Sequence, residues 1–551
     1  MRGHSAKLLP ALLLGAFLFF FKLGSVPLFD WDEAVYAEVT REMLESGDWL
    51  TPRYNGNPFF DKPVLLYWLM ALAFKLWGPT EFAARFWSAA SGMGLLAVTY
   101  LFGTAVASAR VGLLAILILA SGMELVVLSH AALTDMLLTF FITATLYSFY
   151  QGLQESGRAG RWWIPAGYVL MGLAVLTKGP VGMVIPIGTV VIYLLATGRF
   201  REGLSRARPF LGLGLFLLVT LPWYGAIIQT HGWFFVEDFF LEHNIRRFTG
   251  VMGGHAGSPF YYLGILAAGF FPWSAFLPSL LWDLVPRSVA QLRTSEPGRR
   301  LVVYLLIWVG FVFLFFSLAT TKLPNYIAPL FPAVSLLVAL WWDRGLSESP
   351  EGNRGSGLSA VLLLVLAAAL SAVLAATPFF IDWARSRYAA VAPYLLGPVD
   401  LGTAPVLLSL PLMTGALIFF FAVRRRRLLA GVMILVLMMG AFSFILLTRV
   451  VPAVSGYVQV PLKNLAVAAA EQLNPEGRLV VYGIKKPSIL FYARRKVIQI
   501  KSGAQDQLKE ELEKPGRVAV ISKASLMDAL LAQPRLIAFD HRGGYVLATN
   551  F

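Results

Sequence analysis

Two acidic pairs lie in one polar stretch near the start of a very apolar chain. Asp32 and Glu33 are adjacent, and Asp61 is followed directly by Lys62, all within residues 23–82. A carboxylate can act as a general base or bind a cation, whereas a lysine can bind a phosphate. This combination predicts charged chemistry concentrated in one connection between apolar segments.

Other polar segments between apolar runs add side chains of the same kinds. They are Asp135, Lys178, His243, Arg246, Arg247, Lys322 and Tyr326. Each candidate also has a structural explanation when taken alone. The pair Asp32-Glu33 can complement the dipole at a helix N-terminus, a lysine can extend to the membrane interface, and a single histidine can be a hydrogen-bonded residue of the protein core. Together, carboxylates and a histidine suit a hard divalent cation, and lysine and arginine suit a phosphate. The set therefore predicts a site for a phosphate leaving group.

The composition defines the class of protein that must position these residues. The chain has 551 residues, of which 57% are hydrophobic and 14% charged. Apolar runs near or above the length that crosses a hydrocarbon core of about 30 Å recur along it. The first run, 8–21, lacks a following cleavage signal and is expected to remain as a helix. The sequence thus predicts a polytopic α-helical membrane protein, and the absence of cysteine excludes disulfides and thiolate metal sites.

The placement of basic residues predicts the topology. The net charge of +15 could suggest nucleic acid, but the arginines cluster in every second connection, around residues 158–161, 199–208, 287–300 and 424–427. Those connections are expected inside, which gives about thirteen crossings with the C-terminus outside. The predicted spans are 8–22, 83–106, 111–129, 132–151, 162–178, 180–198, 208–228, 259–283, 300–320, 325–343, 358–379, 402–423 and 428–448.

All the candidate site residues then lie on the outer side of the membrane. That compartment has no nucleotide-activated donors, so the chemistry there needs lipid-carried substrates. Within 23–82, the spacing of Val35, Val39 and Met43 predicts an amphipathic helix in the interface. The apolar run 64–77 is too short to cross and predicts a second juxtamembrane helix.

The chain loses its long apolar runs after residue 450. Short β-rich strings at 479–484, 497–500, 518–522, 536–539 and 545–548 alternate with helical stretches at 462–473 and 504–513. We therefore divide the chain into a membrane domain, 1–450, and a small outer soluble α/β domain, 451–551. This second domain shows no nucleotide-binding fingerprint, and its expected role is that of a docking or lid module.

The motifs of the first outer segment resemble those of a known family. Its residues run Asp32-Glu33-Ala34-Val35-Tyr36-Ala37-Glu38, then Gly47-Asp48-Trp49, Asn55-Gly56 and Asp61-Lys62-Pro63. They resemble the GT-C membrane glycosyltransferases and are similar to the 4-amino-4-deoxy-L-arabinose lipid A transferases of the protein O-mannosyltransferase superfamily. The resemblance covers most of residues 1–450. It implies the same architecture of thirteen helices, two juxtamembrane helices and a small outer domain.

The resemblance implies transfer of a sugar from undecaprenyl phosphate at the periplasmic face of the bacterial inner membrane. The most direct expectation is aminoarabinose, or a related sugar, moved to a lipid A phosphate. Asp32 and Asp135 match acidic positions of the family, and Glu33 stands beside Asp32 as a further candidate catalytic carboxylate. Asp61 replaces the family's glutamate and, with His243, would contact a divalent ion such as Zn, Mg or Mn.

The carrier phosphate is expected to meet the basic residues. Lys62 and either Arg246 or Arg247 would bind it according to the resemblance, with Lys178, Lys322 and Tyr326 as further candidates. Attack on the sugar from the face opposite the departing phosphate would invert the anomeric carbon. A hydroxyl acceptor would need Asp32 as a base, whereas a phosphate acceptor would not.

Two other functions remain open. One is transfer of another sugar, or transfer to a hydroxyl acceptor such as a protein Ser/Thr or a glycan. The other is a transporter for a lipid-linked sugar, a class that places ionisable residues near the bilayer midplane. Here the charges gather at one face, with Glu124 as the clearest partial exception. That distribution favours an enzyme, with no nucleic-acid partner.

Overall fold

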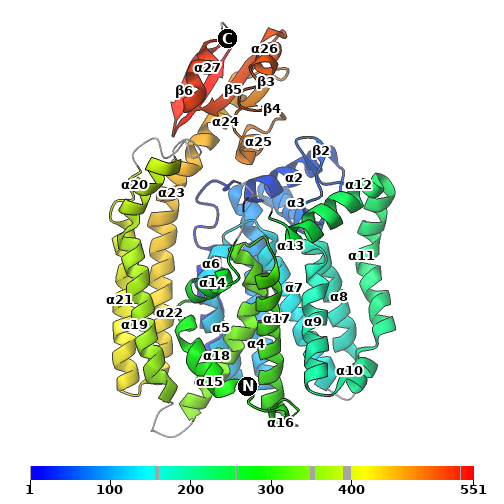
Figure 1. Ribbon diagram of the computed structural model, residues 1–551, viewed down its shortest axis with the longest axis vertical. Coiled ribbons are helices and arrows are strands. Elements are labelled where there is room, and N and C mark those ends of the chain that lie inside the picture. Colours follow the sequence, from blue (N-terminus) through cyan, green and yellow to red (C-terminus); the bar gives the residue numbers. More distant parts are fainter. Residues whose placement is uncertain are drawn as a thin grey trace.

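The chain folds into a helical bundle with a small sheet domain at one end (Figure 1). The structure is a computed structural model that describes residues 2–30, 32–154, 160–251, 254, 257–293, 296–347, 354–388, 399–533 and 535–551. Among these residues, eight helices are long and apolar enough to cross a membrane, and ten if each of two bent pairs counts as one span. The prediction of a polytopic helical membrane protein is confirmed at this level.

The bundle is built from helices that run between its two ends. They are α1 (Arg2–Phe20), α4 (Glu81–Val106), α5 (Ala109–Ala120), α6 (Met123–Ser129), α7 (Thr134–Gln154), α8 (Gly160–Lys178), α9 (Val181–Ala196), α11 (Pro209–His231), α14 (Tyr261–Gly269), α15 (Leu277–Leu284), α17 (Pro297–Leu318), α18 (Phe331–Ser347), α19 (Arg354–Ala375), α21 (Ala404–Arg424) and α22 (Leu428–Ile445). Shorter helices connect them: α10 (Phe200–Ala207), α16 (Val289–Leu292) and α20 (Thr377–Tyr388). The chain termini lie at opposite ends of the molecule, with α10 and α16 at the end that carries the N-terminus (Figure 1).

Two of the predicted spans are broken rather than straight. The run 111–129 forms α5 and α6, which meet at 67°, and the run 259–283 bends by 112° between α14 and the helical stretch Trp273–Leu284. Gly122 stands at the first break and Pro272 at the second. Proline lacks the N–H that would continue the helical ladder, and Gly122 is in extended backbone geometry, which ends the preceding helix. Apolar length alone does not reveal such bends.

The centre of the bundle is α7, which is buried along most of its length. Small residues let its neighbours approach one another closely. A Cβ added to Gly103 of α4 would lie 2.8 Å from the Cα of Gly112 in α5, so neither position has room for a side chain. Such close helix contacts replace the hydrophobic driving force that is missing inside a bilayer.

The end of the bundle next to the C-terminal sheet carries α2 (Asp32–Ser46) and α3 (Leu65–Trp77), joined by the hairpin β1 (Arg53–Tyr54) and β2 (Asn57–Pro58). Both helices were expected along the membrane surface. The structure shows that α2 packs against α3 and the C-terminal helix α25 (Pro487–Ala493), and ten of its fifteen residues are buried. Protein therefore covers the apolar face of α2, and the position of the two helices along the membrane surface stays a prediction.

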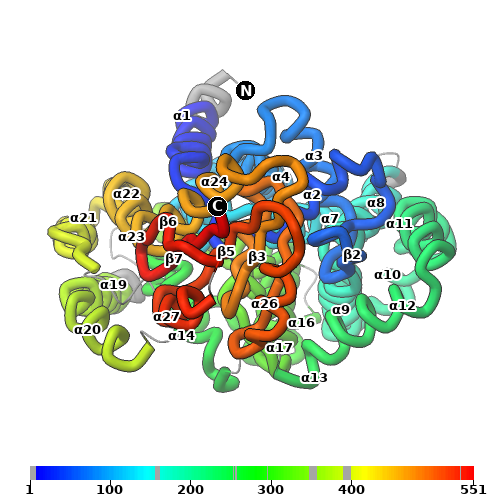
Figure 2. Tube along the Cα trace, turned by 90° about the horizontal axis from the view of Figure 1, so that it is seen from above, coloured from blue at the N-terminus to red at the C-terminus, as the bar shows by residue number. Residues whose placement is uncertain are grey.

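The C-terminal segment forms a five-stranded mixed sheet. Its strands are β3 (Arg478–Tyr482), β4 (Val497–Ile500), β5 (Val518–Lys523), β6 (Ile537–Arg542) and β7 (Tyr545–Thr549), in the order β4-β3-β5-β7-β6. The β3 strand pairs in parallel with β4 and β5, and β7 is antiparallel to β5 and β6. The helices α24 (Val460–Gln472), α25, α26 (Gln505–Glu513) and α27 (Met527–Leu531) accompany the sheet. Seen from above, this part overlies the bundle beside α2 and α3 (Figure 2).

The connection between bundle and sheet is helical throughout. The last span continues from α22 through the π-helix η5 (Leu446–Val450) into α23 (Val451–Val458). Helical structure therefore crosses the domain boundary predicted at residue 450, and α24 follows directly. This extended helix and α24 thus connect the bundle to the C-terminal sheet.

Candidate active site

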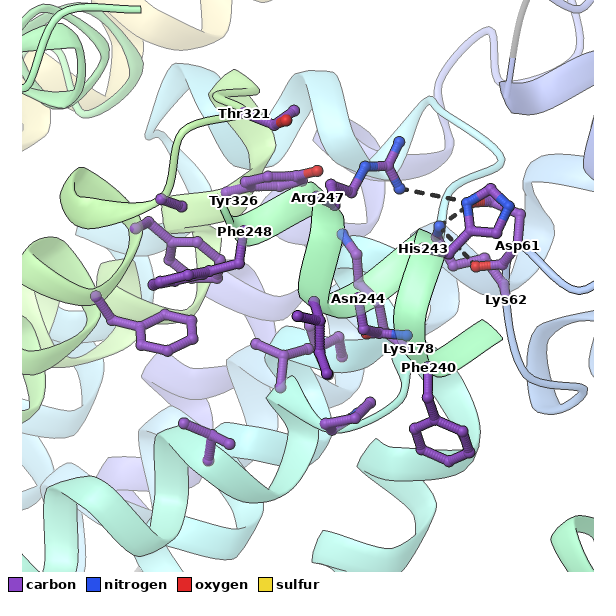
Figure 3. A pocket seen from close by; sticks show the side chains of 18 of the residues that line it. Asp61, Lys62, Lys178, Phe240, His243, Asn244, Arg247, Phe248, Thr321 and Tyr326 are labelled. Atoms are coloured by element: carbon purple, nitrogen blue, oxygen red, sulfur yellow. Dashed lines mark hydrogen bonds and ion pairs between the residues drawn. The ribbon is translucent and has the colours of Figure 1, made fainter. Parts of the chain in front are cut away.

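A cavity of about 490 Å³ lies at the end of the bundle that carries α2 and α3, with charged and aromatic residues in its wall (Figure 3). Its charged lining consists of Asp61, Lys62, Asp135, Lys178, His243 and Arg247. Its apolar lining includes Leu138, Val181, Val184, Phe240, Phe248, Phe315 and Phe316. Residues from five separate predicted outer segments are thus brought together in one place.

Asp61 is the hub of the charged side. Its carboxylate accepts a hydrogen bond from Lys62 Nζ at 2.9 Å, lies 2.9 Å from His243 Nδ1 and 3.5 Å from an Arg247 nitrogen, and accepts from the Tyr36 hydroxyl at 3.4 Å. Burial alone would raise the pKa of Asp61, but Lys62, His243 and Arg247 together hold it well below its usual range. The Asp61 carboxylate therefore stays ionised and holds the side chains of Lys62, His243 and Arg247 in place.

Lys62 is buried beside this carboxylate. Its ammonium also donates to the Asp61 carbonyl at 3.0 Å. Burial lowers the pKa of Lys62, and Asp61 opposes that effect. The acidic neighbour thus helps to keep Lys62 charged in a site that water reaches poorly.

His243 and Arg247 lie on one face of a helix because they are four residues apart. They belong to the π-helix η1 (Val236–Arg246) and the short α13 (Arg247–Thr249) that continues it. Arg246 is on another face, where its side chain is 68% exposed and pairs with Glu242. The two arginines that the sequence left equivalent are separated here, since Arg247 lines the cavity and Arg246 does not.

Asp135 and Lys178 form a second ion pair in the cavity wall. Asp135 lies in the first turn of α7 and Lys178 is the last residue of α8, and their charged atoms are 2.6 Å apart. The Lys178 ammonium also lies 5.0 Å from the centre of the Tyr326 ring. All three residues line the cavity as the sequence predicted, with the Lys178 charge directed at Asp135.

Lys322 has a different environment from the other basic candidates. Its ammonium donates to the carbonyls of Ser317 at 2.8 Å and Ala319 at 2.7 Å, with the Phe316 carbonyl at 3.5 Å. These carbonyls end α17, so the lysine acts as a C-terminal helix cap. Lys322 is not among the cavity-lining residues, and its phosphate-binding role stays a prediction that these contacts do not favour.

Asp32 faces a second, larger cavity of about 800 Å³. The two cavities share His243 and Arg247 in their linings, so they meet at this face of η1 and α13. The Asp32 side chain is reached by solvent within the cavity although protein surrounds it on most sides. Burial raises the pKa of Asp32, while Lys62 and Arg247 act in the opposite direction. Asp32 therefore has the environment of a group that can exchange a proton.

Glu33 is held in a buried ion pair. Arg85 donates to both of its carboxylate oxygens, at 2.9 and 2.8 Å, and the backbone N–H groups of Phe29 and Ala132 add further bonds at 2.9 and 2.7 Å. Burial would raise the pKa of Glu33, but Arg85 and the two N–H donors hold it below the usual range. A catalytic role for Glu33 stays a prediction, and this saturated carboxylate favours a structural one.

The donor atoms for a metal ion are few. Among the described residues, no group of three or more His, Asp and Glu side chains is arranged to hold an ion. However, the buried His243 Nδ1 lies 2.9 Å from an Asp61 oxygen in an orientation that makes no hydrogen bond. Two such atoms suit a shared cation, so Asp61 and His243 fit as partial ligands that need oxygens from water or substrate to complete the set.

Comparison with known proteins agrees with this arrangement. Residues 11–236 match the family model described as dolichyl-phosphate-mannose-protein mannosyltransferase. The chain is 33% identical over 385 residues to an undecaprenyl phosphate-alpha-4-amino-4-deoxy-L-arabinose arabinosyl transferase from Aeromonas salmonicida, a match that covers 68% of each protein. The chain belongs to this arabinosyl transferase family.

The matches to other members are partial in length. The relative with the same description from Edwardsiella ictaluri is 34% identical over 377 residues, which are 68% of this chain and 65% of the relative. For the relative from Enterobacter sp. the shares are 61% and 59%. The matched region thus spans less than two thirds of these arabinosyl transferases.

The fold agrees with a solved structure over nearly the full length. The crystal structure described as ArnT from Cupriavidus metallidurans bound to undecaprenyl phosphate superposes with a TM-score of 0.79 and 24% identity, covering 99% of this chain and 98% of that one. An archaeal oligosaccharyltransferase from Archaeoglobus fulgidus gives a TM-score of 0.52 at 13% identity, covering 95% of this chain and 70% of that one. The arabinosyl transferase fold is therefore present from end to end.

Two contributors to the site carry no strong sequence signal. Tyr36 reaches Asp61 from one turn into α2, and Arg85 anchors Glu33 from the first turns of α4. Tyr36 lies within the motif that carries the family resemblance. Arg85 is a charge near the start of an apolar span, which is a signal for a buried partner because an unpaired cation is costly there.

Proposed function

We propose that the protein transfers 4-amino-4-deoxy-L-arabinose, or a related sugar, from undecaprenyl phosphate to a phosphate of lipid A. Family membership supports this reaction class, and the relatives' names supply the donor and the sugar. The observation that carries the proposal is the convergence of Lys62 and Arg247 on an apolar-walled cavity, which meets at His243 and Arg247 the second cavity that Asp32 faces.

The charged side of the first cavity suits the carrier phosphate. When the glycosyl–phosphate bond breaks, negative charge grows on the departing phosphate, so preorganised cations lower the barrier. Lys62 would supply a point charge, and Arg247 would supply N–H donors in a planar arrangement. Arg247 is 3.5 Å from Asp61 and 26% exposed, so an entering phosphate can engage it without breaking a tight ion pair. Phe248, Phe315 and their neighbours provide apolar surface for the attached lipid.

A divalent ion would act at the same end of the cavity. We propose that Asp61 and His243 hold it, with the remaining oxygens from the substrate and water. When bound, such an ion would neutralise charge on the phosphate. Metal content of the purified protein, compared with that of His243→Ala, tests this assignment, and equal content in the two proteins would count against it.

The acceptor would approach through the second cavity. An acceptor oxygen forms a bond to the anomeric carbon while the bond to the carrier phosphate oxygen breaks, and the electron pair of that bond goes to the phosphate. Attack from the opposite face inverts the anomeric carbon. A lipid A phosphate is already anionic, so Asp32 would then orient the acceptor or bind the sugar ammonium; with a hydroxyl acceptor, Asp32 would take the proton.

We also propose that this site lies on the periplasmic side of an inner membrane crossed thirteen times. The ten candidate spans become thirteen when three further apolar helices are added, namely α1, α8 and α9. Opposite ends for the two termini and arginine-rich connections at the N-terminal end support an odd number of crossings. A reporter fused after Phe551 should be active outside the cytoplasm, and cytoplasmic activity would overturn this topology.

Product identification tests the reaction. Purified protein should be supplied with the undecaprenyl phosphate-linked aminosugar together with lipid A or a serine-containing peptide, and the products analysed by mass spectrometry. The proposal predicts lipid A carrying the added sugar. Transfer to the peptide instead would establish the hydroxyl-acceptor reaction, and absence of any transfer would contradict the proposal.

A further inference from the structure

The segment that leads into Asp32 is not itself a helix or a strand, yet it is held tightly from the bundle side. The Arg85 guanidinium donates to the carbonyls of Leu23 at 3.1 Å, Val26 at 2.9 Å and Pro27 at 3.0 Å, in addition to its bonds with Glu33. One buried arginine thus ties residues 23–27 to the residue directly after Asp32. This contact fixes the two ends of the segment, and Glu33 itself holds the Phe29 N–H at 2.9 Å, which leaves Leu28 and Asp30 to other partners.

The C-terminal domain supplies those partners through Asp30. This carboxylate is only 3% exposed, and it accepts hydrogen bonds from the Ser488 backbone N–H at 2.8 Å and the Ser488 hydroxyl at 3.3 Å. The Lys486 ammonium lies 3.6 Å away, and the Gln459 amide donates at 3.5 Å. Four groups that follow residue 452 therefore converge on one side chain two positions before Asp32. A buried anion held this way has little freedom to move.

A second contact secures the same segment beside Asp30. The Tyr492 hydroxyl accepts a hydrogen bond from the Leu28 backbone N–H at 2.7 Å and donates to Glu81 at 3.1 Å. Lys463 adds an ion pair with Glu81 at 2.6 Å. Leu28 is thus connected through Tyr492 to the start of α4, which also carries Arg85. The C-terminal domain thus holds Leu28 and Asp30, in addition to the contacts that Arg85 and Glu33 make with Pro27 and Phe29.

The hairpin that precedes Asp61 is attached to the same domain. The Asn55 side chain donates to the Val497 carbonyl at 2.9 Å and accepts from the Val497 N–H at 3.0 Å, which pairs it with the edge strand β4. Asn55 has a positive φ of 53°, a conformation that asparagine tolerates better than most residues. Because the contacts are spread over Asp30, Glu81 and Asn55, they describe a fixed attachment rather than a lid hinged at one point.

We propose that the C-terminal domain is a positioning module for the active site, and that Asp30 is the positioning residue through which it fixes the Asp32 carboxylate at the second cavity. This inference rests on the proposed function of Asp32. Asp30 also lines the second cavity, but its carboxylate is occupied by Ser488, Lys486 and Gln459, so we assign it a positioning role and not a catalytic one. Its contribution is that of geometry, since an error of about 1 Å in the position of a reacting group can lower a rate by about 100-fold.

A graded series of variants in the full-length protein tests the inference. Asp30→Asn keeps the shape of the side chain but removes its charge, and Ser488→Ala removes one hydrogen bond to it. The matched control is Asp540→Asn, which breaks the pair with Arg542 in the same domain, away from α2. We expect kcat to fall by about 10- to 100-fold in Asp30→Asn, less in Ser488→Ala and not at all in Asp540→Asn. The KM for the lipid-linked sugar should stay within about twofold of wild type, because the Lys62 end is unchanged.

Hydrogen exchange separates this inference from the reaction itself. Backbone amides in residues 28–33 should exchange faster in Asp30→Asn than in wild type, and amides in α7 should not. Wild-type kcat and exchange in Asp30→Asn would overturn the proposal, as would a loss that matches only a smaller folded fraction. Should the wild-type protein transfer no sugar, the proposed reaction would fail, whereas the exchange result would still decide whether the domain holds this segment.

Discussion

Asp32 and Asp61 are carboxylates of the same outer segment with opposite surroundings. Asp61 lies among Lys62, His243 and Arg247, which hold its pKa well below the usual range. Asp32 faces the second cavity, where burial raises its pKa. Such a division of two acids by environment is how one site supports two roles. The difference indicates that Asp61 holds the basic residues proposed to bind the carrier phosphate, whereas Asp32 is free to take part in the transfer step.

The largest expected effect is on turnover when Asp32 loses its charge. Asp32→Asn should lower kcat for transfer to lipid A by about 100-fold, the scale on which a misplaced reacting group lowers a rate, and by about 10²- to 10⁴-fold with a hydroxyl acceptor, for which Asp32 would be the base. The measurement is steady-state transfer to lipid A by the purified variant. Full activity with an intact fold would remove the role assigned to Asp32.

The next effect concerns donor binding. Lys62→Ala should raise the KM for the lipid-linked sugar by about 10- to 100-fold, since a hydrogen bond to a charged group contributes about 1.5–3 kcal/mol. Unlike Asp32→Asn, this change acts at the donor end, so it should affect KM more than kcat. An unchanged KM would show that the phosphate binds elsewhere.

The neighbouring arginines provide an internal control. Arg247→Ala should weaken donor binding by about tenfold, because its guanidinium lines the cavity. Arg246→Ala should have little effect, because its exposed pair with Glu242 is of the surface kind that contributes about 0–1 kcal/mol. Titration of both variants with undecaprenyl phosphate compares them directly, and equal affinities would contradict the assignment.

The smallest expected effect is on thermal stability, which the two Asp→Asn substitutions should change in opposite directions. A raised pKa means that ionised Asp32 opposes folding above the unfolded pKa, whereas the lowered pKa of Asp61 contributes stability that is lost as pH falls through its folded value. At pH 7, Asp32→Asn should therefore raise the thermal midpoint and Asp61→Asn should lower it, each by roughly 1–3 °C. Shifts of the same sign would show that the two environments do not differ as described.

Much of the architecture was predictable because apolar length and alternation are strong signals. Four of the five C-terminal strands lie within two residues of their predicted bounds, and β6 ends three residues later than predicted, as expected for short β-rich strings between turns. The missed helices are α25 and α27, whose seven and five residues are too few to display helical periodicity. The contact of α25 with α2 also contributes to the burial of α2.

The site was predictable in its residues but less so in their individual positions. The sequence indicated which outer segments carry charge, and the structure gathers most of them in one cavity. Whether Arg246 or Arg247 faces that cavity depends on a π-helical turn that no spacing rule signals. The sequence could not show that Lys322 and Lys178 have different roles, because the partners of Lys322 are backbone carbonyls, which every residue type has.

Retention of the lipid carrier tests the division between the two acids most directly. Undecaprenyl phosphate bound after addition and washing should be quantified by mass spectrometry in wild type, Asp32→Asn and Lys62→Ala, all in the same detergent. We predict retention at the wild-type level in Asp32→Asn and loss of most of the carrier in Lys62→Ala. Equal retention in the two variants, or greater loss in Asp32→Asn, would contradict the account.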